Sequence, residues 1–318
     1  MQISNGGPRT RGFFAGRMSR MVGGLAVAAG LAASPVASAV EGGAFGNFGV
    51  GAQTVASGFV PPKGSTMFYG YLLNYSADRF TDSNGDSAIP GFKANLWVEA
   101  LMVRRTWDVD LPWGLSFSSG FTQEFVHADI EAGGVSDQST GLFEISVQPV
   151  VLSGSTDTLH YVIGTHFLMP SGDFEPDSLA NSTLNYYTFA QELSLTWTPN
   201  ANWMLDLSSN ISFNTRNNDT DYASGDTVGF TWAANYRPTA SPKWQLGVSG
   251  LYQQQIEDDK QNGQTVGDGF RLKKVNAGPQ LTYWFSPAVA MMFKWHHEFD
   301  VENAPQGDLL WLQCVFPL

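Results

Sequence analysis

Apolar and polar residues alternate with a period of two over much of the chain beyond residue 65. In the segment 203–214, for example, Leu205 and Leu207 stand on one parity and Asp206 and Asn210 on the other. Successive side chains of a β-strand point to opposite faces, so this pattern predicts strands with one apolar and one polar face. Beyond residue 65 the sequence has no long run with the 3.6-residue period of an α-helix. It also has no uncharged apolar stretch of about 18 residues, which a membrane-spanning helix would need.

The same pattern recurs along the chain and predicts twelve strands, all antiparallel to their neighbours. Their predicted ranges are 66–75, 92–107, 114–128, 140–152, 158–169, 184–198, 202–214, 226–237, 243–256, 271–285, 288–299 and 307–316. Within 140–152, the alternation places Phe143, Ile145, Val147 and Val151 on one face and Glu144, Ser146 and Gln148 on the other.

The connections between these strands alternate between long and short. Long acidic segments such as 76–91, 129–139 and 300–307 follow the odd-numbered strands, whereas short turns such as 199–202 follow the even-numbered ones. Outer-membrane barrels have this asymmetry, with long extracellular loops and short periplasmic turns. The predicted fold is therefore all-β, a twelve-stranded antiparallel transmembrane β-barrel formed by residues 65–318.

Aromatic residues gather at the ends of the short turns, where an interfacial girdle would lie. The members of this predicted girdle are Trp107, Trp113, Trp197, Trp203, Tyr236, Trp244, Trp284 and Phe285. In a soluble β-sandwich, which is the alternative fold, tryptophans would more often lie mid-strand in the core. Cys314, the single cysteine, stands on the predicted lipid-facing parity and is interpreted as a small apolar residue.

The amino-terminal region differs from the rest in composition. Four arginines precede the apolar run 21–33, and the small residues Ala37-Ser38-Ala39 follow it, a pattern typical of a secretory signal peptide over residues 1–39. Residues 40–64 are rich in Gly and Pro and lack a strand pattern. They are predicted to form either a periplasmic tether or a plug inside the lumen, and the sequence does not decide between the two.

Composition and charge exclude several classes of function. The net charge of −12 disfavours nucleic acid as a partner, because binding to phosphates needs basic residues. A single cysteine excludes an intrachain disulfide framework and a thiolate metal cluster. With 43% hydrophobic and only 14% charged residues, the chain is not of the disordered class.

The polar parity of each strand predicts which side chains face the lumen. There they either form salt bridges and hydrogen bonds with one another or set the electric field that a solute passes through. The candidate lumen-lining residues are Glu124, Glu144, His160, His166, Glu192, Asp206, Asn210, Lys274, Gln280, Lys294, His296 and Glu298.

Catalytic, metal and cofactor sites are not predicted. His160 and His166 are six residues apart on one strand face, about 20 Å at 3.3 Å per residue, too far to share a metal ion. His296 and His297 are adjacent and therefore point to opposite faces. No nucleophile elbow of the G-x-S-x-G type is present, although serines and acids are abundant.

Several short runs resemble a known family. They are PSGDF at 170–174, TDYASGD at 220–226, YQQQIEDD at 252–259, the pair Gly278-Pro279 and GDLLWLQCVFPL at 307–318. Together they resemble the MetA-pathway phenol degradation family, also called phenol degradation protein meta or SphA-like, over most of the chain. The resemblance implies an outer-membrane barrel that helps hydrophobic or aromatic compounds to cross, and it supplies no catalytic residues.

We therefore expect a bacterial outer-membrane channel for passive passage of small hydrophobic or aromatic compounds, linked to phenol or aromatic degradation. Its expected partners are membrane lipid, lipopolysaccharide and such a solute. The alternative is a structural or interaction barrel with a closed lumen and acidic ligand-binding loops; an outer-membrane enzyme is a third, less favoured hypothesis. The solute, the direction of transport and the oligomeric state are not determined by the sequence.

Overall fold

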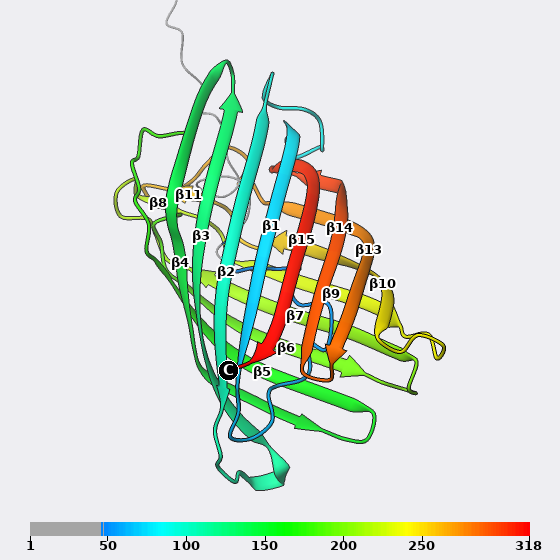
Figure 1. Ribbon diagram of the computed structural model, residues 1–318. Coiled ribbons are helices and arrows are strands. Elements are labelled where there is room, and N and C mark those ends of the chain that lie inside the picture. Colours follow the sequence, from blue (N-terminus) through cyan, green and yellow to red (C-terminus); the bar gives the residue numbers. More distant parts are fainter. Residues whose placement is uncertain (1–45, 47) are drawn as a thin grey trace, which may run out of the picture. The chain divides into compact units, whose positions relative to one another are not determined.

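The strands of this chain close into a barrel. A computed structural model describes residue 46 and residues 48–318, so the predicted signal peptide lies outside the described residues. Twelve antiparallel strands hydrogen-bond in the closed order β1-β15-β14-β13-β10-β9-β7-β6-β5-β4-β3-β2 (Figure 1). The described part of the chain contains no helix that is long and apolar enough to cross a membrane.

Each of the twelve predicted strands is present in the barrel. They are β1 (Thr66–Phe80), β2 (Lys93–Thr106), β3 (Ser116–Ala132), β4 (Val135–Ser155), β5 (Leu159–Pro170), β6 (Thr188–Trp197), β7 (Trp203–Asn214), β9 (Thr227–Tyr236), β10 (Trp244–Gln255), β13 (Lys273–Ser286), β14 (Val289–Glu302) and β15 (Pro305–Pro317). Outside the barrel lie the 3-10 helix Pro112–Gly114 and a small sheet of β8 (Tyr222–Ala223), β11 (Lys260–Gln261) and β12 (Gln264–Thr265).

Two connections that the sequence predicted to be long are tight hairpins. β3 and β4 continue through the predicted loop 129–139 and turn at Gly133 and Gly134, whose φ angles of +59° and +85° suit glycine. Asn303 and Ala304 alone join β14 to β15. Polar residues at the end of a strand that projects into water have the same composition as a loop, so composition could not separate the two.

A bulge in β4 places Val151 on the opposite face from the one predicted. The pairing of β4 with β5 shifts between Val147 and Val150, next to Pro149, which has no N–H to donate. One extra residue exchanges the two faces of a strand. As a result Val150 is exposed and Val151, predicted to lie on the outer face with Val147, is fully buried inside the barrel.

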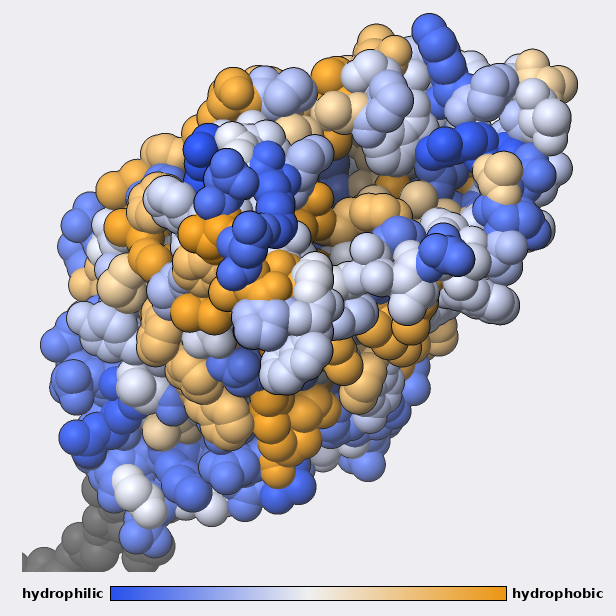
Figure 2. Space-filling view, turned by 90° about the horizontal axis from the view of Figure 1, so that it is seen from below, coloured by the Kyte–Doolittle hydropathy of each residue, from blue (hydrophilic) through white to orange (hydrophobic). Residues whose placement is uncertain are grey.

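The outer wall is apolar along most strands, as a lipid-facing surface requires. Phe121, Leu207, Phe293 and Leu312 are exposed there. Hydrophobic residues form broad patches on the face seen from below, where the surface is also hollowed (Figure 2). The apolar side chains that the alternation assigned to the exterior therefore give the barrel its lipid-facing surface.

Aromatic rings cluster at the end with the short turns. Trp203 packs against Tyr236 with ring centroids 5.1 Å apart, and Trp244 packs against Tyr283 at 4.7 Å. The assignment of Trp284 to the outer girdle is wrong, because its indole Nε1 donates to the buried Gln245 Oε1 at 2.8 Å. A register shift between Trp284 and Ser286 accompanies this inward orientation.

The half of the barrel nearer the long loops contains a buried apolar cluster. It is formed by inward residues of β1, β2, β3 and β15 together with Phe92 and Ala180 from the loops. Its largest members are Leu73, Tyr75, Phe80, Phe92, Leu96, Leu309 and Trp311. The interior of this barrel is therefore not uniformly polar.

We expect that an arginine on the lipid-facing wall destabilises the barrel. Phe293→Arg places a charge at mid-strand, where its side chain is 50% exposed to lipid, and should lower the free energy of unfolding by about 2–4 kcal/mol. The measurement is urea unfolding in phospholipid vesicles.

The matched control is Val135→Arg, at the tip of the β3–β4 hairpin, which projects into water. It should cost no more than about 1 kcal/mol. Equal losses for the two variants would contradict the assignment of the β14 face to lipid.

Candidate functional site

A stretch of the chain before β1 runs through the inside of the barrel. We call residues 48–60 the lumen segment. The Gly51 N–H donates to Thr231 Oγ1 at 3.0 Å, and the Thr54 carbonyl accepts hydrogen bonds from Asn235 and Gln280, both at 3.2 Å. These partners are inward-facing residues of β9 and β13, and Thr54 itself is fully buried.

Lys294 on β14 anchors the first half of the lumen segment. Its Nζ donates to the carbonyl oxygens of Gly51 and Ala52, the latter at 3.2 Å, and lies 3.4 Å from Thr54 Oγ1. The ammonium also sits 4.6 Å from the centroid of the Trp311 ring. A fully buried cation needs such partners, because burial without them would cost several kcal/mol.

Asp206 on β7 anchors the second half. Its Oδ1 accepts from the Ser57 N–H at 2.9 Å, from Ser57 Oγ at 3.1 Å and from Thr196 Oγ1 at 2.6 Å. Gly58 follows at a place where any Cβ would lie only 2.4 Å from the His160 carbonyl oxygen. The segment can pass this close to β5 because position 58 has no side chain.

Two cavities adjoin the lumen segment. One of 160 Å³ lies beside the segment and is lined by residues from β1–β7, β9, β10 and β15, and one of 780 Å³ lies toward the end with the short turns. Ala52, Gln53, Tyr71 and Met102 line both cavities, so the two adjoin at these side chains. The lumen is therefore divided but not filled by the segment.

Both cavities have mainly apolar linings. Leu73, Val98, Phe143 and Leu168 contribute to the smaller cavity. The prediction that Phe143 lies on the outer face is therefore wrong, and a register shift in the pairing of β3 with β4 lies beside it. Val55, Met67, Met204 and Met292 contribute to the larger one. The barrel thus offers an interior surface that an apolar molecule can contact, together with a small number of polar groups.

The structure places all twelve predicted lumen residues on the inside of the barrel, where each is buried or half-buried. Four pair within the set: His166 with Glu192 at 2.8 Å and Lys274 with Glu298 at 3.1 Å. Some of the others have partners outside the set, as His296 does with Ser249 at 2.6 Å. Which of them a solute contacts stays a prediction.

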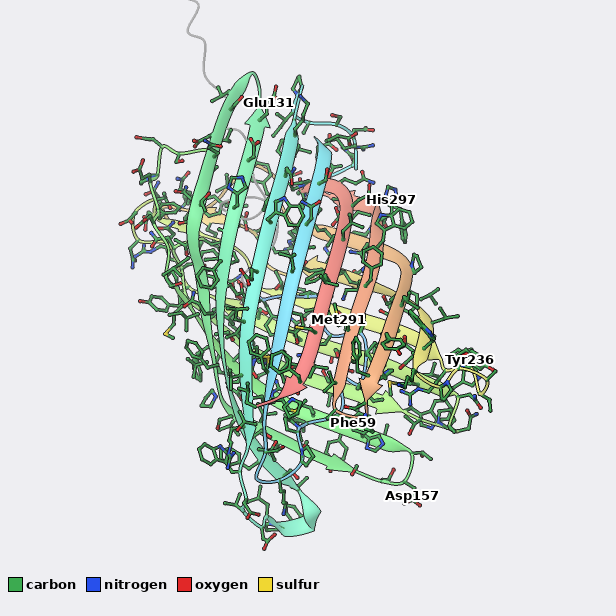
Figure 3. All side chains as sticks on the ribbon, in the orientation of Figure 1. Phe59, Glu131, Asp157, Tyr236, Met291 and His297 are labelled. Carbon is green, nitrogen blue, oxygen red and sulfur yellow. The ribbon has the colours of Figure 1, made fainter. Side chains whose placement is uncertain are left out.

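The two histidines of β5 lie at different ends of the lumen segment. His160 stacks on Phe59 with centroids 3.9 Å apart, and His166 meets Phe48 edge-on at 5.0 Å. Phe59 lies near the lower end of the barrel in Figure 3, whereas Glu131 and His297 mark the upper end. Within residues 46 and 48–318, no three His, Cys, Asp or Glu side chains gather as metal ligands.

The sequence reasoning missed several interior residues. Arg104 on β2 is 4% exposed and donates to Gln148 Oε1 at 2.7 Å, and Met102 lies next to it on the inner face. Both faces of β2 carry apolar residues, so alternation gave little signal there. Trp311 was not predicted to face the lumen, because the prediction selected polar residues and tryptophan is largely apolar.

The loops at the upper end are joined by a buried carboxylate. Asp259 accepts hydrogen bonds from the Tyr222 hydroxyl at 2.5 Å, the Gly225 N–H at 2.9 Å and Gln255 Nε2 at 2.6 Å. Burial raises the pKa of Asp259 to about 7, although these three donors act in the opposite direction. The contact therefore links the loops after β7 and β10 in a pH-sensitive way.

Comparisons with known proteins agree with this architecture. A family model described as "Putative MetA-pathway of phenol degradation" matches residues 77–314. An outer membrane channel from Pseudomonas putida F1 superimposes with a TM-score of 0.72 at 15% identity, covering 83% of this chain and 98% of that one. A search of curated proteins returned no significant match.

Two other solved structures are less similar. The β-domain of the Bordetella autotransporter BrkA has a TM-score of 0.49 at 10% identity, covering 80% of this chain and all of that one. The CymD monoaromatic hydrocarbon channel has a TM-score of 0.42 at 9% identity, covering 80% and 88%. The family model confirms the predicted family, and the Pseudomonas structure confirms the predicted barrel fold.

We expect the loop contact at Asp259 to weaken as the pH rises. Its pKa of about 7 is above the value of about 3.9 for an unfolded chain, so its stabilising effect is complete below pH 4 and is lost as the pH approaches 7. The hydrogen-exchange protection factor of the Gly225 amide should fall about tenfold over this interval. In Asp259→Asn the protection should not depend on pH, and an unchanged pH dependence in that variant would refute the assignment.

We expect removal of the Lys294 ammonium to loosen the lumen segment. In a Cys314→Ser background with Gln53→Cys as the probe, Lys294→Met should raise the rate of labelling by a small thiol reagent about tenfold, since hydrogen bonds to a charged donor are lost. Lys273→Met is the matched control, because Lys273 pairs with Asp300 and Glu302 and not with the segment. Equal labelling rates in both variants would contradict the anchoring role.

Proposed function

We propose that this chain, which belongs to the family described as "Putative MetA-pathway of phenol degradation", is an outer-membrane channel through which small hydrophobic or aromatic compounds pass without energy input. The proposal involves no chemical step, so it assigns the chain no enzymatic activity. In the outer membrane the lipid-facing wall would contact phospholipid and lipopolysaccharide.

The observation that carries the proposal is the apolar surface inside the barrel. Wide porins have polar, water-filled interiors. Here Leu73, Met102, Phe143 and Leu168 face a cavity instead of lipid. Apolar area in contact with an apolar solute is favourable by about 25 cal/mol per Å², so such a lining favours entry of hydrophobic molecules over ions.

The size of the interior supports small solutes. A barrel of twelve strands is wider than a filled eight-stranded barrel and narrower than a sixteen-stranded porin. The lumen segment reduces this width further. A solute that moves between the two cavities would pass Gln53, Tyr71 and Met102, which line both of them.

The lumen segment acts in this proposal as a plug that limits flow. Its contacts with Lys294 and Asp206 come from β14 and β7, so it is held from different parts of the wall. Carbonyl oxygens and serine groups of the segment satisfy these two buried charges. A partly plugged lumen would restrict ions while it leaves apolar surface accessible to a hydrophobic solute.

The test is influx of phenol and toluene into vesicles that have lipopolysaccharide in the outer leaflet. Vesicles with the full chain should take up both solutes faster than protein-free vesicles. Deletion of residues 48–60 should raise the rate several-fold and should also raise ion conductance, because the largest obstruction inside the barrel is removed. Retention of the folded barrel is checked by its resistance to unfolding in cold detergent.

Two outcomes would contradict the proposal. Uptake equal to the protein-free rate for both solutes would favour the closed structural or interaction barrel. Ion conductance as high as that of an open porin in the intact chain would show that the lumen segment does not restrict the channel.

A further inference from the structure

Among the described residues, one carboxyl group in the smaller cavity has no hydrogen-bond partner. Two acidic residues line it, Glu124 on β3 and Glu192 on β6. Glu192 pairs with His166 and accepts a hydrogen bond from Ser194. By contrast, the carboxylate of Glu124 has no hydrogen-bond partner among the described residues.

Other polar groups near Glu124 are already engaged. Gln148, which lines the same cavity, accepts from the Arg104 guanidinium at 2.7 Å. Glu144 lies on the neighbouring strand β4, outside the cavity lining, and accepts from Thr183 Oγ1 at 2.8 Å. Glu124 is therefore the acidic group in this cavity that remains free to accept a hydrogen bond from a ligand.

The volume of the cavity sets the size of that ligand. It measures 160 Å³, and an engineered apolar cavity of about 150 Å³ in another protein binds benzene. A single six-membered ring fits this space, whereas two fused rings exceed it. Leu73, Val98, Phe143 and Leu168 provide apolar contacts for the ring.

We propose that this cavity is a binding site for a neutral single-ring aromatic compound with one hydroxyl donor, and that Glu124 determines the specificity by accepting the hydroxyl hydrogen. This inference rests on the proposed channel function and deepens it, because it names the chemistry of the solute. An anionic ring such as benzoate is disfavoured, since Glu144 and Glu192 carry two further carboxyl groups in or beside the cavity.

The site also includes the lumen segment. Phe48, Val50 and Ala52 of this segment also line the cavity. A ring held here contacts the segment and the wall at the same time. Passage to the larger cavity then requires the ring to leave Glu124 and to move past Gln53 and Tyr71.

The experiment measures binding to the full chain in detergent by titration calorimetry with phenol, toluene and benzoate as probes. Phenol should bind at least tenfold more tightly than benzoate. Glu124→Leu should weaken phenol binding about tenfold, as expected for loss of a buried hydrogen bond, and should leave toluene binding unchanged. Toluene binding also shows that the variant has kept its fold.

Three variants complete the test. Glu124→Gln keeps a carbonyl acceptor and should weaken phenol binding less than Glu124→Leu does. Glu99→Leu is the matched control, because Glu99 lies on the adjacent strand β2 and faces outward, and it should have no effect. Ala100→Leu, opposite Glu124 in the β2–β3 register, should reduce the space and weaken both phenol and toluene.

Equal loss of phenol binding in the Glu124 and Glu99 variants would overturn the assignment of Glu124, and so would binding of benzoate as tight as that of phenol. If vesicles still take up phenol and toluene while binding does not depend on Glu124, the inference about this site fails and the channel proposal stands. If neither solute enters the vesicles, the channel proposal itself fails.

Discussion

The antiparallel pairing of β1 with β15 is the constraint on which the rest of the structure depends. Lipid offers no hydrogen-bond partners, so each backbone N–H and C=O in the wall must pair within the sheet. A sheet with two free edges cannot meet that requirement, whereas a closed one can. Closure also determines which side chains face lipid and which face the interior.

Closure of the barrel also buries charged side chains in its interior. Lys274, Lys294, Glu298 and Asp206 are buried inside the barrel, where an unpaired charge is costly. Lys274 and Glu298 neutralise each other, but Lys294 and Asp206 are satisfied largely by the lumen segment. The segment and the charged wall therefore stabilise one another, and this couples the stability of the interior to the width of the channel.

The proposed functions follow from the cavities that the lumen segment does not fill. Its contacts concentrate on the wall between β5 and β14, and the smaller cavity remains beside it with a mainly apolar lining and, among the described residues, one carboxyl group without a hydrogen-bond partner. Apolar contacts provide affinity but do not fix the orientation of a ligand, and a single polar group adds selectivity. A narrow channel for aromatic compounds needs both features, and the two arise here from different parts of the chain.

Alternation in the sequence was enough to predict the twelve strands, the barrel and the side of the wall on which the charged residues lie, because the two-residue period is a local property of each strand. It assigned Phe143, Val151 and Trp284 to the wrong face, because a register shift near each of them exchanges the faces of the strand and composition does not reveal such shifts. The course of residues 48–60 and its bonds to Lys294 and Asp206 arise from contacts between residues more than a hundred positions apart, and the cavity at Glu124 is lined by residues from many strands. Only the tertiary structure decides these, because the distances between such residues depend on how the whole ring closes.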